Sequence, residues 1–206
     1  MYIPAHFKVS DEATLLNFMR ENSFAILFTH EGGSSVATHL PLLIDDDGKG
    51  KRCLIGHVAR ANPQTQHLVG DALAVFHGPH AYVSPTWYGQ PKNVPTWNYA
   101  AVHVYGRIEV CDHPSEKLAI LEKMTAFYEG SQAKPWRIAD IPSDFRDKLL
   151  TALTAFRIVI LRIEGKWKLN QNKSEAERAG VIRALKDSPR EHEREIARLM
   201  EWKPDA

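Results

Sequence analysis

The segment 97–110 constrains the fold more than any other part of this sequence. Two sets of side chains alternate along it, Tyr99, Ala101, His103 and Tyr105 with Ala100, Val102, Val104 and Gly106. Successive side chains of a β-strand point to opposite faces, so this alternation predicts one long strand. The fold must therefore be built around a sheet.

Shorter apolar segments, separated by turn residues, predict further strands. With the long strand, the predicted set is 24–28, 36–44, 53–58, 72–77, 80–84, 97–110 and 156–163. The first three follow one another across turns at 31–34 and 46–50, which are rich in Gly and Asp. We therefore expect these three strands to form an antiparallel meander.

Helix-capping residues place helices between and after the strands. The predicted helices are 10–20, 62–69, 114–128, 143–153 and two that begin at Ser174 and Ser188. Ser10 and Asn62 suit the N-cap position, and both final helices open with Ser followed three residues later by Glu. The pattern predicts an α+β, mainly β protein, in which an antiparallel barrel carries flanking helices and a C-terminal helical pair. We expect a barrel domain over 1–173 and a helical extension over 174–206.

Composition and charge exclude several classes of protein. The chain has 206 residues, of which 44% are hydrophobic and 25% charged, as in a globular protein and unlike a disordered or collagen-like one. Its 26 Lys and Arg against 25 Asp and Glu give a net charge of +1, which does not favour binding along a phosphate backbone.

Targeting and redox signals indicate a cytoplasmic protein. Cys53 and Cys111 lie apart in strand-like segments, which predicts small buried hydrophobes and neither a disulfide framework nor a zinc site. The N-terminus lacks the pattern of a signal peptide, and the apolar runs are shorter than the ~20 residues that span a bilayer.

The histidines do not favour a metal cofactor. His77 and His80 form the tightest pair, but it spans a predicted turn and has no carboxylate or thiolate nearby to complete a ligand set. The sequence also lacks glycine-rich phosphate loops and the Gly-x-Ser-x-Gly motif of acyl transfer. A nucleotide-sized ligand must therefore be held differently.

The segment 57–63 is the best candidate for binding a phosphate. His57 ends a predicted strand, Arg60 follows as a fixed cation, and the helix that Asn62 caps directs free N–H groups to the same place. A guanidinium beside a helix start suits a phosphate monoester. The alternative, an ordinary strand-to-helix turn with a surface arginine, fits the spacing equally well.

Two further segments are rich in aromatic and amide side chains. Thr96, Trp97 and Asn98 belong to the first, 95–99, and the second is 167–173. Stacking faces beside amide partners suit a planar ligand with several ring heteroatoms. The alternatives are a strand entrance for the first segment and a polar loop for the second.

Taken together and in this order, six blocks of the chain resemble the PaiB family, known as FMN-binding negative transcriptional regulators. The blocks are Met1–Phe7, Ala37–Pro41, His57–Gln64, Phe76–Tyr88, Val94–Tyr99 and Lys168–Ser174. The resemblance implies the FMN-binding split barrel, with flavin mononucleotide (FMN) as cofactor and a homodimer whose flavin sites lie between the subunits.

The resemblance also implies roles for individual residues. Arg60 and Asn62, with His57 beside them, are expected at the phosphate, and His39 and Pro41 at the flavin ring. Thr96, Trp97 and Asn98 are expected to bound the ring pocket. The residues expected to close it are Lys168, Gln171, Asn172 and Lys173. One subunit would supply 57–62 and the other 96–98 or 168–173. No residue stands out as an acid, base or nucleophile.

Two functions remain open at this stage. The family implies a regulator, with DNA or another regulator as partner. However, residues 174–206 hold seven Lys and Arg against eight Asp and Glu, which does not favour direct DNA binding. The alternative is an FMN-dependent oxidoreductase that acts on a small planar substrate with NAD(P)H or oxygen, beneath the loop 85–95. A planar ligand such as haem is a third reading.

Overall fold

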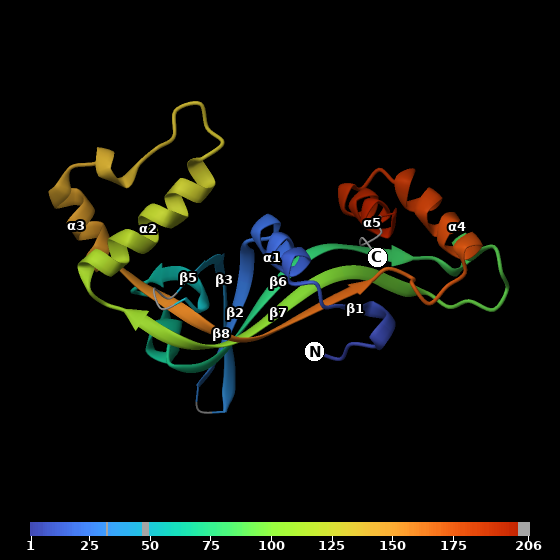
Figure 1. The fold of residues 1–206 in the computed structure, drawn as a ribbon, viewed down its shortest axis with the longest axis horizontal. Coiled ribbons are helices and arrows are strands. Elements are labelled where there is room, and N and C mark those ends of the chain that lie inside the picture. The colour runs from blue at the N-terminus through green and yellow to red at the C-terminus, as the bar shows by residue number, and fades with distance from the viewer. Residues whose placement is uncertain (32, 47–49, 202–206) are drawn as a thin grey trace. The chain divides into compact units, whose positions relative to one another are not determined.

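An antiparallel sheet dominates the computed structural model, which describes residues 1–31, 33–46 and 50–201. The strand order is β3-β2-β6-β7-β8-β5-β4, and β1 pairs with β8 (Figure 1). The strands are β1 Lys8–Val9, β2 Phe24–Glu31, β3 Ser34–Pro41, β4 Leu43–Asp46, β5 Arg52–Ala59, β6 Gly70–Val83, β7 Thr96–Cys111 and β8 Leu153–Lys168. The helices are α1 Glu12–Glu21, α2 Pro114–Glu129, α3 Ser143–Thr151, α4 Glu175–Lys186 and α5 Glu191–Glu201. Short 3-10 helices are η1 Ala5–Phe7, η2 Pro63–His67, η3 Pro85–Tyr88 and η4 Ile138–Asp140.

The chain divides into two compact units. Unit 1 comprises Met1–Phe18, His77–His103 and Glu164–Ala206, and unit 2 comprises Met19–Phe76 and Val104–Ile163. Strands β6, β7 and β8 each contribute one end to either unit. The predicted extension 174–206 belongs to unit 1, together with the earlier segments 1–18 and 77–103. Its status as a separate domain stays a prediction.

The predicted meander of the first three strands is wrong. Strand β2 pairs with β3 and β6, whereas β4 pairs with β5. The apolar run 36–44 breaks at the buried Leu42, whose N–H donates to the carbonyl of Ser23 over 2.9 Å. Because β3 and β4 lie at opposite ends of the strand order, the chain crosses between the two edges of the sheet at this residue, as barrel closure requires. The predicted turns at 31–34 and 46–50 fall partly on Gly32 and 47–49, outside the described residues.

The prediction of two strands around His77 and His80 is also wrong, because β6 runs through both. Gly78 allows close packing here. A Cβ atom at Gly78 would lie 2.6 Å from Cζ of Phe18, so the absence of a side chain lets α1 approach the strand. The long strand 97–110 is confirmed as β7.

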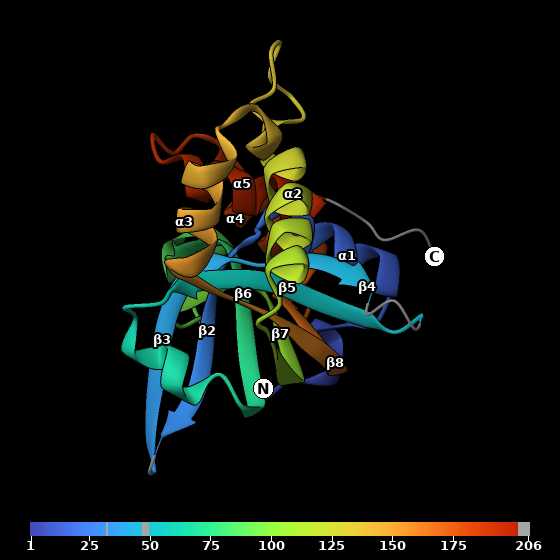
Figure 2. The same cartoon turned by 90° about the vertical axis from the view of Figure 1, so that its left-hand side faces the viewer.

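The core of unit 2 lies between the sheet and α2. Its buried residues include Cys53 and Cys111, which are not joined in a disulfide, and Ile120 and Met124 of α2. The expectation of small buried hydrophobes at Cys53 and Cys111 is therefore confirmed. Helix α3 lies beside α2 (Figure 2).

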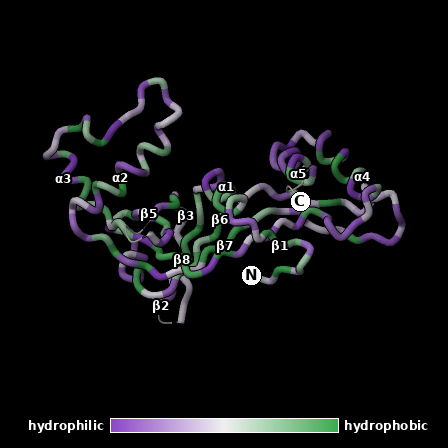
Figure 3. The backbone as a smooth tube through the Cα atoms, in the orientation of Figure 1, coloured by the Kyte–Doolittle hydropathy of each residue, from purple (hydrophilic) through white to green (hydrophobic). Residues whose placement is uncertain are grey.

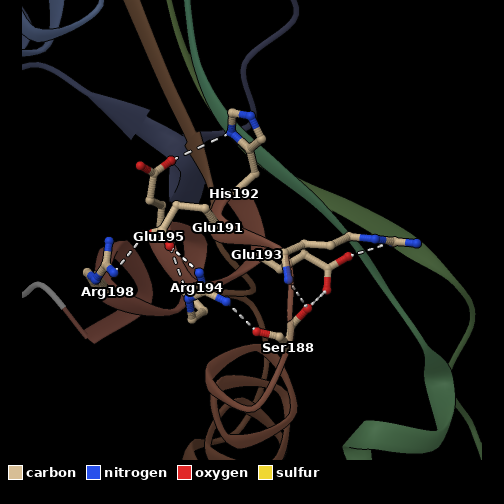
Figure 4. Close-up of polar contacts among 8 residues, drawn as sticks. Ser188, Glu191, His192, Glu193, Arg194, Glu195 and Arg198 are labelled. Carbon is tan, nitrogen blue, oxygen red and sulfur yellow. Dashed lines mark hydrogen bonds and ion pairs between the residues drawn. The ribbon is translucent and has the colours of Figure 1, made fainter.

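Local hydrogen bonds fix where the helices begin. The capping box at Ser174 and Glu177 is confirmed. The corresponding prediction at Ser188 is wrong, because α5 begins only at Glu191, and the Ser188 hydroxyl donates to Glu193 (Figure 4). At α1, Asp11 and not Ser10 accepts the N–H of Thr14, over 2.7 Å. A carboxylate in the first turn also benefits from the helix dipole.

Hydropathy follows burial in this structure. Much of α5 is hydrophilic, apart from a buried stripe at Ile196, Ala197 and Met200 (Figure 3). Within the described ranges, no helix combines the length and the apolar character needed to cross a bilayer.

Candidate functional site

The first predicted site lies in unit 2, where β5 leads into η2; we call residues 60–64 the Arg60–Gln64 turn. Arg60 donates hydrogen bonds to backbone carbonyls at the start of β8 and in the two residues before it. Its N–H donates to Ala152 over 2.9 Å, and its Nε–H donates to the carbonyl of Thr151 over 2.7 Å. One terminal nitrogen lies 3.4 Å from the carbonyl of Leu153, and the side chain is exposed. Because a guanidinium has five N–H groups, this anchoring fixes Arg60 and leaves donors for a ligand.

Asn62 begins η2, as the sequence predicts. Its Oδ1 accepts the N–H of Gln64 over 2.9 Å, and Pro63 occupies the first position of the helix. Its Nδ2 donates to the Thr38 hydroxyl of β3 over 3.1 Å. The amide oxygen of Asn62 therefore serves as the helix cap, and one N–H of its amide nitrogen remains for another partner.

Gln64 fastens the turn to the β2–β3 hairpin, a role that the sequence analysis missed. Its side chain is fully buried. The amide nitrogen lies 3.2 Å from the carbonyl of Leu27, 3.0 Å from the Thr29 hydroxyl and 3.4 Å from the carbonyl of Val36. The sequence offered no local signal for this role, because the contacted residues lie 28 to 37 residues earlier in the chain.

His57 on β5 carries a nitrogen without a partner. Its Nδ1 is buried and has no hydrogen bond within the described part of the chain. Burial also lowers the pKa of His57, so the imidazole is neutral near pH 7. A neutral imidazole with an unused ring nitrogen can serve a ligand group or an ordered water molecule.

The ring-side residues His39 and Pro41 lie on β3. His39 is exposed, and its ring stacks on Phe24 of β2, with centroids 6.4 Å apart and planes inclined by 29°. Pro41 pairs in register with Phe24. Thr38, which accepts the Asn62 hydrogen bond, also lies on β3, so the β2–β3 hairpin that the Arg60–Gln64 turn contacts carries both an aromatic pair and a hydroxyl.

In unit 1, Lys168 at the end of β8 meets the start of β7. Its Nζ donates to the Thr96 hydroxyl and, over 2.6 Å, to the carbonyl of Trp97. Burial, with Lys166 nearby, lowers the pKa of Lys168. The structure therefore brings together three of the predicted residues, Lys168, Thr96 and Trp97.

Trp97 and Asn98 point to opposite faces of β7. Trp97 is 54% exposed and lies near His80 and Tyr82, with ring centroids 6.1 and 5.9 Å away. Asn98 is fully buried, and its Nδ2 lies 3.4 Å from the sulfur of Met200 in α5. One chain therefore does not present both side chains to the same pocket, because strand neighbours alternate.

The segment after Lys168 uses its amides within unit 1. Gln171 donates to the carbonyl of Trp167 over 2.7 Å and accepts the N–H of Leu169 over 2.8 Å. Asn170, which has a φ of 61°, is buried and donates to the Tyr88 hydroxyl over 2.9 Å. Asn172 is exposed. Asparagine tolerates a left-handed backbone, which was the available signal for Asn170.

The loop 85–95 is fixed by these residues. Lys173 donates to Asn93 over 2.5 Å, Asn93 donates to Glu177 over 3.0 Å, and Tyr88 is buried beneath Asn170. Hydrogen bonds from Asn93 and Ser174 lower the pKa of Glu177, which stays ionised. The loop is therefore part of the packed structure of unit 1.

The histidine pair seen in the sequence gains a third member. The rings of His77 and His80 lie 5.1 Å apart, and His192 of α5 stacks on His80 at 5.6 Å. Over residues 1–31, 33–46 and 50–201, no three His, Cys, Asp or Glu side chains are grouped as a metal site requires.

The chain matches one protein family and several proteins of related sequence. The model of the family described as "Putative FMN-binding domain" matches residues 1–162. Protease synthase and sporulation protein PAI 2 of Bacillus subtilis is 38% identical over 212 residues, which cover 98% of each chain. The uncharacterized protein AN0679 of Emericella nidulans is 30% identical over 223 residues, 88% of this chain and 89% of the other.

Solved structures share the fold at low identity. The flavocytochrome Anf3 of Azotobacter vinelandii aligns with a TM-score of 0.64 at 14% identity, over 86% of this chain and 78% of that one. The FAD and heme binding protein of Mycobacterium smegmatis aligns with a TM-score of 0.61 at 18% identity, over 84% and 78%. These likenesses and the strand order confirm the antiparallel split barrel predicted from the sequence.

Proposed function

The chain belongs to the FMN-binding family whose model spans residues 1–162, which confirms the PaiB resemblance, and from this premise we propose that it is a homodimeric, FMN-binding regulator. FMN is its cofactor. When bound, FMN accepts or donates electrons and hydride, while the protein binds the coenzyme and sets its surroundings. The roles of particular residues are part of the proposal.

The Arg60–Gln64 turn fits the ester end of FMN, and the anchored Arg60 guanidinium is the observation that carries the proposal. Two backbone carbonyls position it, and its remaining N–H groups are exposed. The η2 helix contributes less than its sequence suggests, because Asn62 already accepts the N–H of Gln64. Charge-assisted hydrogen bonds from Arg60, with the unused ring nitrogen of His57, are therefore assigned to the phosphate group.

Exposed apolar side chains support a homodimer. In unit 2, Phe24 on β2 is 67% exposed and Leu161 on β8 is 66% exposed. Large apolar side chains on the surface of strands are typical of protein interfaces. We propose that a second copy of the chain covers them, and that the flavin sites lie between the copies with residues 57–62 from one and 96–98 or 168–173 from the other.

The charges on α5 support regulation through a protein partner. Glu191 pairs with Arg194 and, over 2.8 Å, with Arg198 (Figure 4). Arg190 pairs with Glu193 over 3.0 Å. Arginines that are paired with carboxylates of α5, whether they lie on this helix or just before it, offer little to a phosphate backbone. We therefore propose that the flavin state alters a surface which a second protein recognises.

One observation favours the alternative function, an FMN-dependent oxidoreductase. Trp97, Tyr82 and His80 form an exposed aromatic group on β6 and β7 of unit 1. Such a group can stack on a planar substrate. The sequence predicts that the loop 85–95 lies over the flavin, which stays a prediction; Asn93 fastens this loop to Lys173 and to Glu177 of α4.

Titration of the purified protein with FMN tests the proposal. We expect quenching of flavin fluorescence with one FMN per chain, and a dimer by light scattering. A monomer, or a chain that takes up no FMN, would contradict it. Anaerobic mixing with NADH or NADPH then separates the two functions, because rapid bleaching with repeated turnover identifies an oxidoreductase.

A further inference from the structure

Unit 1 contains a cleft that overlaps the proposed flavin contacts only in part, because Gln171 and Lys173 belong to both. Its volume is about 500 Å³, and it is lined by residues of the segments 6–9 and 167–178 and by Leu199 of α5. We call it the Lys8 cleft. Ligand sites for small molecules commonly have volumes of about 300–1,000 Å³.

The inner wall of the Lys8 cleft is apolar. Trp167 and Leu169 of the β8 end contribute to it and are buried, and Val9 and Leu199 complete it. Gln171 also lines the cleft, but both ends of its amide are engaged within the turn, with Trp167 and Leu169. The wall is therefore formed by an indole and by aliphatic side chains.

Cations surround this apolar wall. Lys8, Lys173 and Arg178 line the cleft with His6, against the single carboxylate of Glu175. No ion pair within 4.0 Å joins these three cations to a carboxylate in the described part of the chain, although Lys173 donates to Asn93 and Arg178 donates to the carbonyl of Met200 over 2.7 Å. Neutral acceptors thus hold two of the cations in place, and the charge of Lys173 also acts on the ionised Glu177 beside the cleft.

The excess of positive charge in the Lys8 cleft is local, as other parts of the molecule show. The arginines of α5 are paired with Glu191 and Glu193. A second cleft, of about 390 Å³ in unit 2, is lined by Trp136 and other apolar residues but carries Glu122 and Glu129 against Arg137. The whole chain has a net charge of +1 only. Unpaired cations beside an apolar wall are therefore specific to the Lys8 cleft when these two clefts are compared.

We propose that the Lys8 cleft binds a small amphipathic organic anion, whose ring or chain lies against Trp167 and whose acidic group lies among Lys8, Lys173 and Arg178. Charge complementarity selects an anion, and the apolar wall selects a carboxylate or sulfonate that carries a hydrophobic group over inorganic ions. This site is separate from the Arg60–Gln64 turn and does not rest on the proposed function, although it shares Gln171 and Lys173 with the segment 168–173 that the proposed function places near the flavin.

Fluorescence titration with 8-anilinonaphthalene-1-sulfonate, an amphipathic anion that emits in apolar surroundings, tests the proposal on the full chain. The variants are Lys8→Gln combined with Lys173→Gln, and Arg137→Gln in the second cleft as the matched control. We expect the double variant to weaken dye binding about tenfold, as expected for lost charge-assisted contacts, and the control to bind as the wild type does. Lys8→Gln alone carries the test if the double variant does not fold, because Lys8 is exposed.

Competition identifies the chemistry of the ligand. We expect 2-naphthoate to displace the dye and the uncharged 2-naphthylmethanol to do so poorly. Equal displacement by both, or unchanged dye affinity in the Lys8 variants, would overturn the proposal. Displacement by FMN would also overturn it, because the cleft would then belong to the flavin site. FMN uptake measured on Lys8→Gln alone, whose residue lies outside the proposed flavin contacts, shows separately whether the proposed cofactor site is intact.

Discussion

Two turns of this protein look alike in sequence and differ in what their side chains do. The Arg60–Gln64 turn follows β5 and opens η2, and the segment 168–173 follows β8 and precedes α4. In the first, the amides of Asn62 and Gln64 bind the chain itself while the Arg60 side chain is exposed. In the second, Asn170 and Gln171 also bind the chain itself.

The cations of the two turns differ in how they are held. Arg60 keeps N–H groups for a ligand after its carbonyl contacts, because a guanidinium has donors on several edges. Lys168 uses two of its three N–H groups on Thr96 and Trp97 and is half-buried. Amides after a strand therefore mostly build the turn, and a ligand is better sought at the exposed cation, which has more donors left over.

The largest effect that we expect concerns the amide buried in the first turn. Gln64→Ala should lower the free energy of unfolding by about 3 kcal/mol, because Thr29 and two carbonyls lose their partner and a cavity is left. Urea unfolding measures this loss. Gln66→Ala, at an exposed position of η2, is the control and should be nearly neutral. Similar losses in both variants would show that Gln64 is not the fastening of this turn.

The next effect separates ligand binding from stability. Arg60→Ala should weaken FMN binding by about 2 kcal/mol, the scale of a lost charge-assisted hydrogen bond. Equilibrium titration of flavin fluorescence measures it. Arg107→Ala removes an exposed arginine that pairs with Asp71 over 3.6 Å, and should leave FMN affinity unchanged. Unaltered FMN affinity in the Arg60 variant would show that the FMN phosphate does not bind at this turn.

Substitutions of Asn170 in the second turn should lower the free energy of unfolding. Asn170→Gly removes the hydrogen bond to Tyr88 but suits the positive φ, and should cost about 1 kcal/mol. Asn170→Ala adds the strain of a left-handed backbone and should cost about 2 kcal/mol. Thermal unfolding compares the two variants. If FMN affinity falls while stability does not, Asn170 acts in binding and the contrast between the turns fails.

The smallest effect is a dependence on pH. Burial lowers the pKa of His57 in the folded chain, so between that value and the unfolded value of about 6.5 the unfolded chain binds more protons. The stability contributed by neutral His57 is therefore present above about pH 6.5 and is lost as the pH falls through the folded pKa. His57→Gln should make the decline in stability from pH 7 to pH 5 shallower, as urea unfolding at each pH would show. An unchanged slope would show that other groups cause the loss of stability at low pH, such as His77 or His103, whose pKa values burial also lowers.

Sequence patterns predicted those features that depend on residues adjacent in the chain. The Asn62-Pro63 pair fixed the start of η2, and alternation fixed β7, because capping and pleating depend on neighbours in sequence. The break at Leu42 could not be read in the same way. The apolar run continues through it, and only closure of the barrel requires the chain to change edges there.

Part of the site was also predictable only in outline. The residue types of 95–99 indicated stacking and amide partners, but alternation along β7 separates Trp97 from Asn98, and α5 covers the latter. The partners of Asn170 and Lys173 come from the loop 85–95, some 80 residues earlier in the chain. Contacts over such sequence separation follow from the packing of unit 1.

Gly180 in α4 ties helix and loop into one cooperative element. A Cβ atom at this position would lie 2.2 Å from the carbonyl oxygen of Trp87, so the backbones of α4 and η3 are in direct contact. A surface loop alone moves within nanoseconds to microseconds, whereas a segment packed on a helix moves by local unfolding over microseconds to seconds. Separation of η3 from α4 would therefore be slow, and amide exchange in η3 and α4 should rise together when it occurs.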